Sequence, residues 1–350
     1  MGFGVPGELT RAVPAVSAAL IEYGGFLKAR NMSQSTQDQS VSVLKYLREA
    51  AGNIPVSDIQ PHHIDTMFSN REWAQGTRNN YLQHINNFMK WCRVQRYMPY
   101  DYNPAAHWQS RKVVKRNKTW LTLPVLEALV MGAGPRDRAF MAVGIFTFLR
   151  SSEIITLKIR DIDFQNDEID VYRIKTKQED RLPMCAELRA EMVLWLTHYR
   201  EQCGTLDHEW LLVPAQGPQP MTGVPGARRL TKKEGTFPPL KPTTVISAPF
   251  LIVRRHMRRL GLEVKKGDGC HILRRSGARN LFEELRSQGH DGAARRTQSM
   301  LGHSSVVITE GYLGIDYERR KRNQSLAGKP MFGNGSSALE IESVKAIESQ

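Results

Sequence analysis

The chain has 350 residues, a length typical of two domains, and the composition of a globular protein. Its 49 lysines and arginines against 35 acidic residues leave a net charge of +14, which favours a polyanionic partner, nucleic acid first. The longest apolar run, residues 140–149, is about half of what a bilayer crossing needs. No secretory signal is visible, and the four scattered cysteines form no CxxC pair. These features argue against a membrane protein, a disulfide framework and a zinc site, and they favour a cytoplasmic location.

Residues 15–98 show a helical pattern throughout. Apolar residues recur at three- and four-residue spacing in four segments, with no convincing strand between them. Ser35 and Thr36 are suited to cap the second helix, which Gly52 would end. We therefore expect a helical domain here, preceded by an extension over residues 1–14.

Residues 99–118 differ in character, because prolines are followed by a run of lysines and arginines. This composition indicates a linker between domains. In so basic a chain, contact with phosphate is favoured over the alternative of a merely solvated connector. The basic side chains expected to contact DNA are Lys112, Lys115, Arg116 and Lys118.

The second unit is expected over residues 119–328. Most of it is helical, but the period changes to two over residues 169–174, which predicts a strand. A basic turn at residues 175–177 and a partner strand ending at Pro183 complete a β-hairpin. Residues 210–213 suggest another short strand. The predicted fold class is mainly α with a small antiparallel β-sheet.

Residues 214–242 interrupt the second unit. They are rich in Gly and Pro and predict a long loop. Loops of this length are uncommon in compact domains unless they are functional or disordered.

Three short boxes carry the residues that point to chemistry. The first reads FLRSSE and follows a buried helix, the second reads HILR, and the third reads LGH with a tyrosine nine residues later. Each box alone is weak, and the signal lies in their order and spacing. The side chains concerned are Arg150, Glu153, His271, Arg274, His303 and Tyr312.

In these boxes the chain resembles the tyrosine recombinases, the integrase family of phages and bacteria, from about residue 15 to residue 330. The resemblance implies a two-domain DNA clamp, in which a helical core-type DNA-binding domain precedes a catalytic domain. The chain departs from the family at Phe148, where glycine is usual, and at Ser276, where Thr or His is more common. The first change is expected to alter how the preceding helix packs, and neither removes a reactive group.

The resemblance also implies the reaction, a transesterification at a DNA phosphodiester that needs no metal, ATP or other cofactor. Tyr312 would be the nucleophile that forms a 3′-phosphotyrosyl link, with His271 as its general base. Arg150 and Arg274 would stabilise the transition state, because arginine offers planar, bidentate donors to phosphate oxygens. His303 would donate a further hydrogen bond to the transition state.

The catalytic lysine of the family lies in a hairpin, eight residues before a proline. Counting back from Pro183 gives Lys175 as the general acid. Lys177 is the competitor, since it would lie on the same face of an extended chain. The alternative is that both lysines only contact phosphate. Glu153 is expected to support Arg150.

Further DNA contacts are expected from one helix of each domain. A solvated basic face is the alternative for the arginines of the second domain. The candidates are Arg78, Asn79, Gln83 and Lys90 in the first domain and Arg254, Arg255 and Arg258 in the second.

The partners implied are double-stranded DNA at core-type sites and three further copies of the chain in a homotetramer on DNA. Residues 329–350 are expected to dock on a neighbouring subunit, with a frayed terminus as the alternative. Too few residues precede the first helix for an additional arm-binding domain. A host architectural protein or directionality factor is left open, and no membrane partner is expected.

The function favoured is the integration, and also excision, of a phage or mobile element. A chromosome-dimer-resolving recombinase of the same family is one alternative. A DNA-binding protein that keeps the fold without catalysis is the other.

Overall fold

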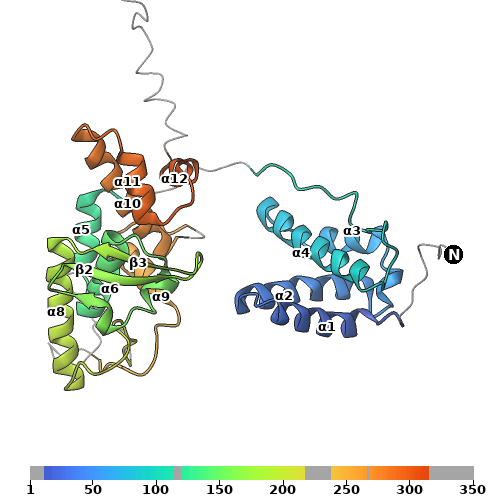
Figure 1. Cartoon of the computed structure of the whole chain (residues 1–350), viewed down its shortest axis with the longest axis horizontal. Helices are drawn as coiled ribbons and strands as arrows, with labels where there is room; N and C mark the ends of the chain where they lie inside the picture. Colours follow the sequence, from blue (N-terminus) through green and yellow to red (C-terminus); the bar gives the residue numbers. More distant parts are fainter. Residues whose placement is uncertain (1–11, 114–119, 217–237, 266–267, 315–350) are drawn as a thin grey trace, which may run out of the picture. The chain divides into compact units, whose positions relative to one another are not determined.

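The computed structural model describes residues 12–113, 120–216, 238–265 and 268–314 (Figure 1). The chain divides into two compact units, Met1–Arg116 and Asn117–Gln350. No helix within the described ranges is long and apolar enough to cross a membrane. The tail over residues 329–350 lies outside the described residues.

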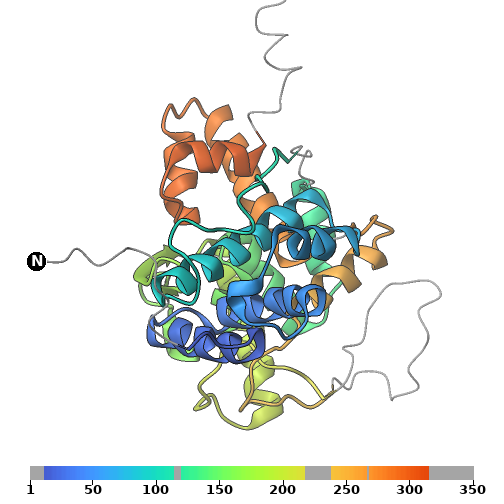
Figure 2. The same cartoon turned by 90° about the vertical axis from the view of Figure 1, so that its right-hand side faces the viewer.

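The first unit is a bundle of four helices, as the helical periodicity predicts, and Figure 2 turns it toward the viewer. The aromatic rings of the first and last helices interlock in its core. The ring centre of Tyr23 lies 5.3 Å from those of Phe88 and Trp91. The elements are α1 (Val16–Ala29), α2 (Gln34–Ala51), the 3-10 helix η1 (Val56–Asp58), α3 (Pro61–Ser69) and α4 (Gln75–Val94).

The ends of α2 follow local chemistry, with one correction to the prediction. Ser33 is the capping residue, because its hydroxyl accepts a hydrogen bond from the Thr36 backbone N–H at 3.3 Å. The predicted cap at Ser35 was therefore wrong by two residues. Gly52 ends the helix as predicted, with a φ of 80° that favours glycine.

The first part of the 99–118 segment packs on the helical bundle. The Tyr102 hydroxyl donates a hydrogen bond to the Ile59 carbonyl at 3.0 Å. The Trp108 indole N–H donates one to the Asp65 carboxylate at 2.7 Å. These aromatic anchors, which proline and charge content do not disclose, join this part of the segment to the first unit.

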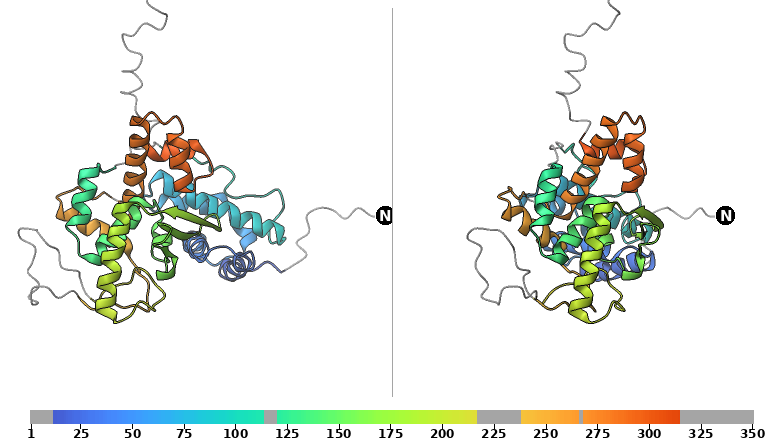
Figure 3. Two further views of the ribbon diagram at one scale, coloured as in Figure 1. Left: turned by 60° about the vertical axis from the view of Figure 1, so that its left-hand side comes forward. Right: turned by 90° about the vertical axis from the view of Figure 1, so that its left-hand side faces the viewer.

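The second unit is built around α6, which packs against α5, α8 and α10. Gly277 allows α10 to approach α6 closely, because a Cβ built on this residue would lie only 1.9 Å from the Ile145 carbonyl oxygen of α6. The helices are α5 (Leu123–Met131), α6 (Pro135–Phe146), α7 (Ser151–Ile154), η2 (Ile159–Asp161), α8 (Ala186–Cys203), α9 (Pro249–Arg259), α10 (Cys270–Ser287), α11 (Ala293–Leu301) and α12 (Val306–Leu313). Figure 3 shows α11 and α12 beside α10 at one end of this unit, opposite the C-terminal end of α8.

The sheet has three antiparallel strands in the order β1 (Ile162–Asp163), β2 (Glu168–Arg173) and β3 (Gln178–Pro183). The β2–β3 hairpin was predicted, and Arg173 pairs with Gln178 across its turn. Residues 210–213 do not form the predicted strand. They make an isolated bridge between Trp210 and Lys158, and Leu211 to Val213 are wholly buried. A short apolar run does not distinguish a buried irregular segment from a strand.

The described ends of the predicted 214–242 loop are held together. Ala215 and Leu240 form an antiparallel bridge. The backbone N–H of Gln216 donates to the Pro239 carbonyl, and that of Lys241 donates to the Pro214 carbonyl, both at 2.8 Å. Residues 217–237 lie outside the described residues.

Candidate active site

Arg150 precedes α7 and is held by a buried carboxylate. One oxygen of Glu153 accepts the Arg150 backbone N–H at 2.8 Å, and the other accepts its Nη1 at 3.0 Å. Glu153 is buried, and Arg173 also lies 3.9 Å from it, so two cations offset the cost of burying this charge. The Arg150 side chain remains 21% exposed, which leaves it within reach of a ligand.

Phe148, in the place where glycine is usual, links α6 to this site. Its φ of 55° lies in the left-handed region, which costs an ordinary residue about 1–2 kcal/mol. Its ring is buried in a cluster with Ala278 and Phe282 of α10. Gly277 makes room for the ring, because a Cβ there would lie 2.8 Å from it. Packing of the ring against α10 thus offsets the backbone strain.

Arg274 joins all three boxes from the buried face of α10. Its Nη1 donates to the Phe148 carbonyl, and its Nη2 donates to the Leu301 carbonyl at 2.7 Å. Burial lowers the pKa of the Arg274 guanidinium to about 10, so it remains a cation at neutral pH. Main-chain carbonyls hold the side chain in place without neutralising its charge, which suits it to meet an anion.

The geometry around His303 defines its tautomer. Nε2 faces Arg274 Nη2 at 3.4 Å, and because arginine only donates, this nitrogen must be the acceptor. The proton of the neutral ring is therefore on Nδ1, which lies 3.1 Å from the Thr309 hydroxyl. Thr309 can accept this proton because its own hydrogen is directed at the Ser305 carbonyl at 3.3 Å. The third box and α12 are thereby connected.

Tyr312 lies against the same two side chains. Its ring meets that of His303 edge to face, with centres 5.2 Å apart. The guanidinium carbons of Arg274 and Arg275 each lie 5.9 Å from its ring centre. Burial raises the pKa of Tyr312, although the charges of Arg274 and Arg275 oppose this shift. The phenol is therefore neutral at physiological pH, beside cations able to stabilise its anion.

The structure brings Arg150, Arg274, His303 and Tyr312 together, with Glu153 buried against Arg150. The predicted general base and the two candidate lysines lie at more exposed places. His271 is exposed in the first turn of α10.

Lys175 and Lys177 are exposed in the 174–177 turn of the hairpin. The expectation that both lysines share one face of an extended chain was wrong. Lys177 has a φ of 55°, and its N–H closes the turn on the Arg173 carbonyl at 2.8 Å.

Arg173 is a residue that the motif analysis missed. It lies on the buried face of β2 and is 2% exposed. Its guanidinium donates to Asp180 on β3 at 2.9–3.0 Å and to the Met300 carbonyl at 2.8 Å. The period-two pattern of Ile169 and Val171 continues to Arg173, and this signal could have revealed a buried cation connecting the hairpin to the third box.

The sequence over residues 120–319 matches the model of the phage integrase family. The match covers more than half of the chain and includes all the residues that converge in the second unit. The chain belongs to this family, the tyrosine recombinases.

The chain also resembles curated proteins at lower identity. It is 24% identical over 250 residues to the tyrosine recombinase XerC 2 of Ralstonia nicotianae, covering 69% of this chain and 62% of that protein. It is 25% identical over 180 residues to the protein y4rF of Sinorhizobium fredii, covering 51% of this chain and 35% of y4rF. The chain thus spans about a third of one relative and less than two thirds of the other.

Solved structures share the fold of the recombinase. A lambda integrase dimer bound to a COC′ core site has a TM-score of 0.63 at 16% identity, covering 88% of this chain and 79% of that one. The XerH recombinase in a post-cleavage complex with a palindromic difH substrate has a TM-score of 0.63 at 20% identity, covering 89% and 84%. The fold is accordingly mainly helical with a small antiparallel sheet.

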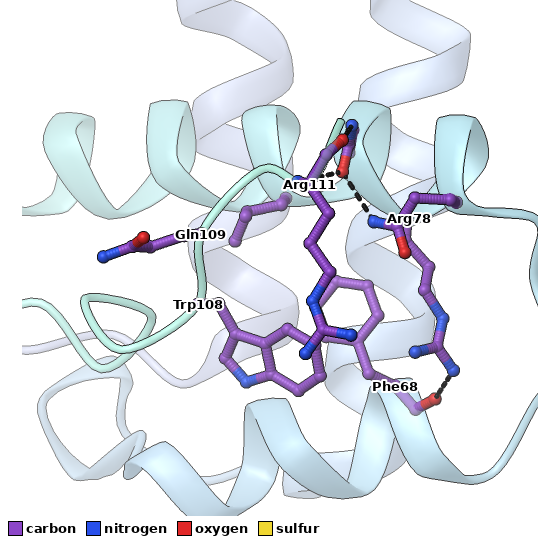
Figure 4. A pocket seen from close by; sticks show the side chains of 8 residues that line it. Phe68, Arg78, Trp108, Gln109 and Arg111 are labelled. Atoms are coloured by element: carbon purple, nitrogen blue, oxygen red, sulfur yellow. Dashed lines mark hydrogen bonds between the residues drawn. The ribbon is translucent and has the colours of Figure 1, made fainter. Parts of the chain in front are cut away.

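The predicted DNA-binding residues of the first unit divide into two groups. Arg78 donates to the Phe68 carbonyl at 3.1 Å, and Asn79 exchanges two hydrogen bonds, at 2.7 and 3.1 Å, with the main chain of Arg111 (Figure 4). They line a shallow pocket with Trp108. Gln83 and Lys90 are exposed on α4. The first two side chains thus hold the bundle and the 99–118 segment, and their contact with DNA stays a prediction.

The arginines of α9 point to different partners. Arg254 donates to the Asp268 carbonyl at 2.6 Å, and Arg255 pairs with the buried Asp137. Arg258 is exposed. DNA binding by these residues also stays a prediction.

Of the linker lysines and arginines predicted to contact DNA, Lys112 is exposed. Lys115, Arg116 and Lys118 lie outside the described residues.

Proposed function

We propose that this chain is a site-specific recombinase that cuts and rejoins DNA through a 3′-phosphotyrosyl intermediate. The observation that carries the proposal is the convergence of Tyr312, Arg274 and His303 within one chain. Burial keeps the Tyr312 phenol neutral, and Arg274, held by two main-chain carbonyls and facing the His303 imidazole, lies beside it. This arrangement suits a nucleophile that ionises as phosphate arrives.

The reaction exchanges one phosphoester for another. His271 takes the hydroxyl proton of Tyr312, and the phenolic oxygen attacks phosphorus while Arg150 and Arg274 bind the non-bridging oxygens. The bond from phosphorus to the 5′ oxygen breaks, and Lys175 gives that oxygen a proton. Attack by another 5′ hydroxyl reverses these steps on the partner strand. Because the number of phosphoester bonds is conserved, no ATP is needed.

His303 changes its protonation in this scheme. Its Nε2 accepts from Arg274, so donation to a phosphate oxygen requires a proton on Nε2, which comes either from Nδ1 of the same ring by a change of tautomer or from solvent. An incoming phosphate draws the Arg274 donors to itself and so leaves Nε2 available to carry that proton. Thr309 keeps Nδ1 in place throughout.

Covalent capture tests the activity. The full chain is incubated with a library of nicked duplexes of random sequence, and DNA that stays on denatured protein is amplified and sequenced. The enriched duplex, called here the trapped duplex, is then the substrate. Tyr312→Phe is expected to abolish the adduct, whereas Tyr172→Phe, at an exposed position on β2, is expected to keep it. An adduct that survives Tyr312→Phe, or no adduct from the unaltered chain, overturns the proposal and in the second case favours non-catalytic DNA binding.

A modified leaving group identifies the general acid. A trapped duplex with sulfur in place of the bridging 5′ oxygen needs no proton on departure, because a thiolate leaves readily. It should restore cleavage to the Lys175→Ala variant and have no special effect on Lys177→Ala. The reverse pattern assigns the role to Lys177, and rescue of neither assigns both lysines to phosphate binding.

The biological role we propose is integration and excision of a phage or mobile element at core-type sites in the cytoplasm. The active assembly would be a homotetramer that clamps DNA, with residues 329–350 of each chain docked on a neighbouring subunit. Similarity to proteins named integrase and to proteins named XerC makes chromosome-dimer resolution the second candidate. Sequencing the host genomic fragments captured on Tyr312 separates the two roles. Sites at the edge of a mobile element support integration. A single site near the replication terminus supports dimer resolution.

A further inference from the structure

Arg279 lies on α10 beyond the second box and belongs to none of the catalytic boxes. Its side chain is 2% exposed. A buried guanidinium is costly unless its donors are engaged, so the partners of Arg279 reveal what it stabilises. No step of the reaction described above uses this residue.

The partners of Arg279 connect three segments of the second unit. Its Nη1 donates to the Leu313 carbonyl at 2.9 Å, and its Nη2 pairs with Glu283 at 2.5 Å. Its guanidinium carbon lies 5.4 Å from the ring centre of Trp120 and 5.8 Å from that of Phe282. Leu313 is the last residue of α12 and directly follows the nucleophile.

The helix that carries Tyr312 depends on such contacts. It has eight residues, and a helix this short is not stable alone in water. At its N-terminal end, the Ser305 side chain caps the Ile308 N–H at 3.3 Å. At its C-terminal end, Arg279 satisfies one of the carbonyls that a helix leaves open and meets the negative end of the helix dipole. Arg279 thus holds the end nearest to the nucleophile.

The same face of α10 also holds the chain just before α5, at residues 120–121. The Ser276 hydroxyl accepts the Leu121 N–H at 2.8 Å, and the Asn280 side chain donates to the Leu121 carbonyl at 2.9 Å. Trp120, next to Leu121, covers Arg279 and is 38% exposed. A displacement of Trp120 would therefore disturb the side chain that holds α12.

We propose that Arg279 is a positioning residue that fixes the tyrosine helix, and that Trp120 couples the chain at residues 120–121 to the position of Tyr312. This inference rests on the proposed function, because it assigns a reason for Tyr312 to be held. It predicts that loosening Arg279 slows the attack on phosphorus without weakening the hold on DNA.

The first test compares Arg279→Met, which keeps an apolar stem but removes the donors, with Arg279→Lys, which keeps one charged donor. Single-turnover adduct formation on the trapped duplex is expected to fall about 100-fold for the methionine variant, the order of loss for a misplaced reacting group. The lysine variant should recover about ten-fold of that loss, since it restores charge but not the planar fork. Affinity for DNA should be unchanged in both.

Two readouts separate positioning from general destabilisation. Hydrogen exchange should rise at the amides of α12 and stay unchanged in α6 and α8. The loss of rate should be equal on natural and sulfur-bridged duplexes, because the leaving group is not affected. Arg138→Met is the matched control, because Arg138 pairs with Glu191 on α8. It removes a half-buried guanidinium elsewhere and should leave the adduct rate intact.

Trp120→Leu keeps the proposal testable if Arg279→Met does not fold. Trp120 is partly exposed, so its replacement should fold, and losing a ring from a buried cation is expected to slow adduct formation a few-fold. Unchanged rates in folded Arg279→Met or Trp120→Leu, or an equal loss in Arg138→Met, overturn the inference. If the unaltered chain forms no adduct, the proposed function fails. Exchange at α12 then still reports whether Arg279 holds the helix.

Discussion

Replacing Gly277 with alanine is expected to push α10 away from α6 and to disable the active site. The added Cβ would lie 1.9 Å from the Ile145 carbonyl oxygen, whereas such contacts are essentially never shorter than 3.0 Å. The two helices must therefore separate locally by about 1.1 Å, the difference between these distances. The obstacle is backbone, which cannot turn aside as a side chain can.

The cost can be estimated from general packing energies. Overpacking a core costs typically 1–3 kcal/mol, and a backbone clash belongs at the upper end. Alanine favours the helix by about 1 kcal/mol relative to glycine, so the free energy of unfolding should fall by about 2 kcal/mol in total. The same shift would move Arg274 away from the Phe148 carbonyl that holds it. A displacement of this size at a reacting centre costs about 100-fold in rate.

Urea unfolding and the rate of adduct formation on the trapped duplex check this prediction. Gly144→Ala is the matched control, because Gly144 also lies between α6 and α10. Its Cβ would meet side chains alone, the Leu273 Cδ1 methyl at 3.2 Å and Ile154 Cδ1 and Leu273 Cβ at 3.4 Å, and a flexible methyl can yield by a few tenths of an ångström. That variant should be as stable and active as the unaltered chain. If Gly277→Ala keeps both stability and rate, close packing of these helices is not what places Arg274.

Three further predictions concern the buried Asp137, the tautomer of His303 and the contact of Asn79 with the 99–118 segment. Burial raises the pKa of Asp137, but a hydrogen bond from His256 and the charges of two nearby arginines outweigh it and lower this pKa to about 2. Burial lowers the pKa of His256. Both groups therefore bind fewer protons in the folded chain than in the unfolded one. The free energy of unfolding, measured in urea, should fall as the pH drops below about 6.5, the ordinary pKa of histidine. His256→Asn should flatten this dependence between pH 7 and pH 5. Thr309→Val should slow adduct formation about ten-fold by removing the acceptor for His303 Nδ1, with Thr309→Ser restoring it, and equal rates would exclude the assigned tautomer. Asn79→Ala should lower the free energy of unfolding by about 1 kcal/mol and speed tryptic cleavage after Arg111, whose main chain Asn79 binds. Unchanged digestion would show that this contact does not hold the 99–118 segment on the bundle.

Local periodicity predicted most of the architecture. The second helix ends at Gly52 as predicted, and the hairpin turn falls where the period-two pattern stops. Arg150, Arg274, His303 and Tyr312, all from the predicted boxes, lie together, whereas His271 of the second box is exposed and its role stays a prediction. The predicted strand at residues 210–213 failed because burial, and not pairing, explains its apolar residues.

The buried arginines could not be recognised in the same way. Arg173 and Arg279 each reach another part of the unit through a main-chain carbonyl, of Met300 and Leu313 respectively, and a carbonyl acceptor leaves no signature in a sequence. The arginines of α9 were interpreted as one basic face because they are close together in the sequence, which does not show which partner each one binds. Their partners, such as the buried Asp137 for Arg255, become visible only when distant elements pack.

The buried guanidiniums at the active site also separate two kinds of salt dependence. Ions in solution compete with lysines and arginines on the surface for phosphate, so the affinity of the chain for DNA should fall steeply as salt is added. Arg274 is 2% exposed and lies where mobile ions screen weakly. Once DNA is bound, the rate of strand cleavage should therefore change little with ionic strength. Salt would govern how often this recombinase engages a duplex, and hardly at all how fast it then cuts.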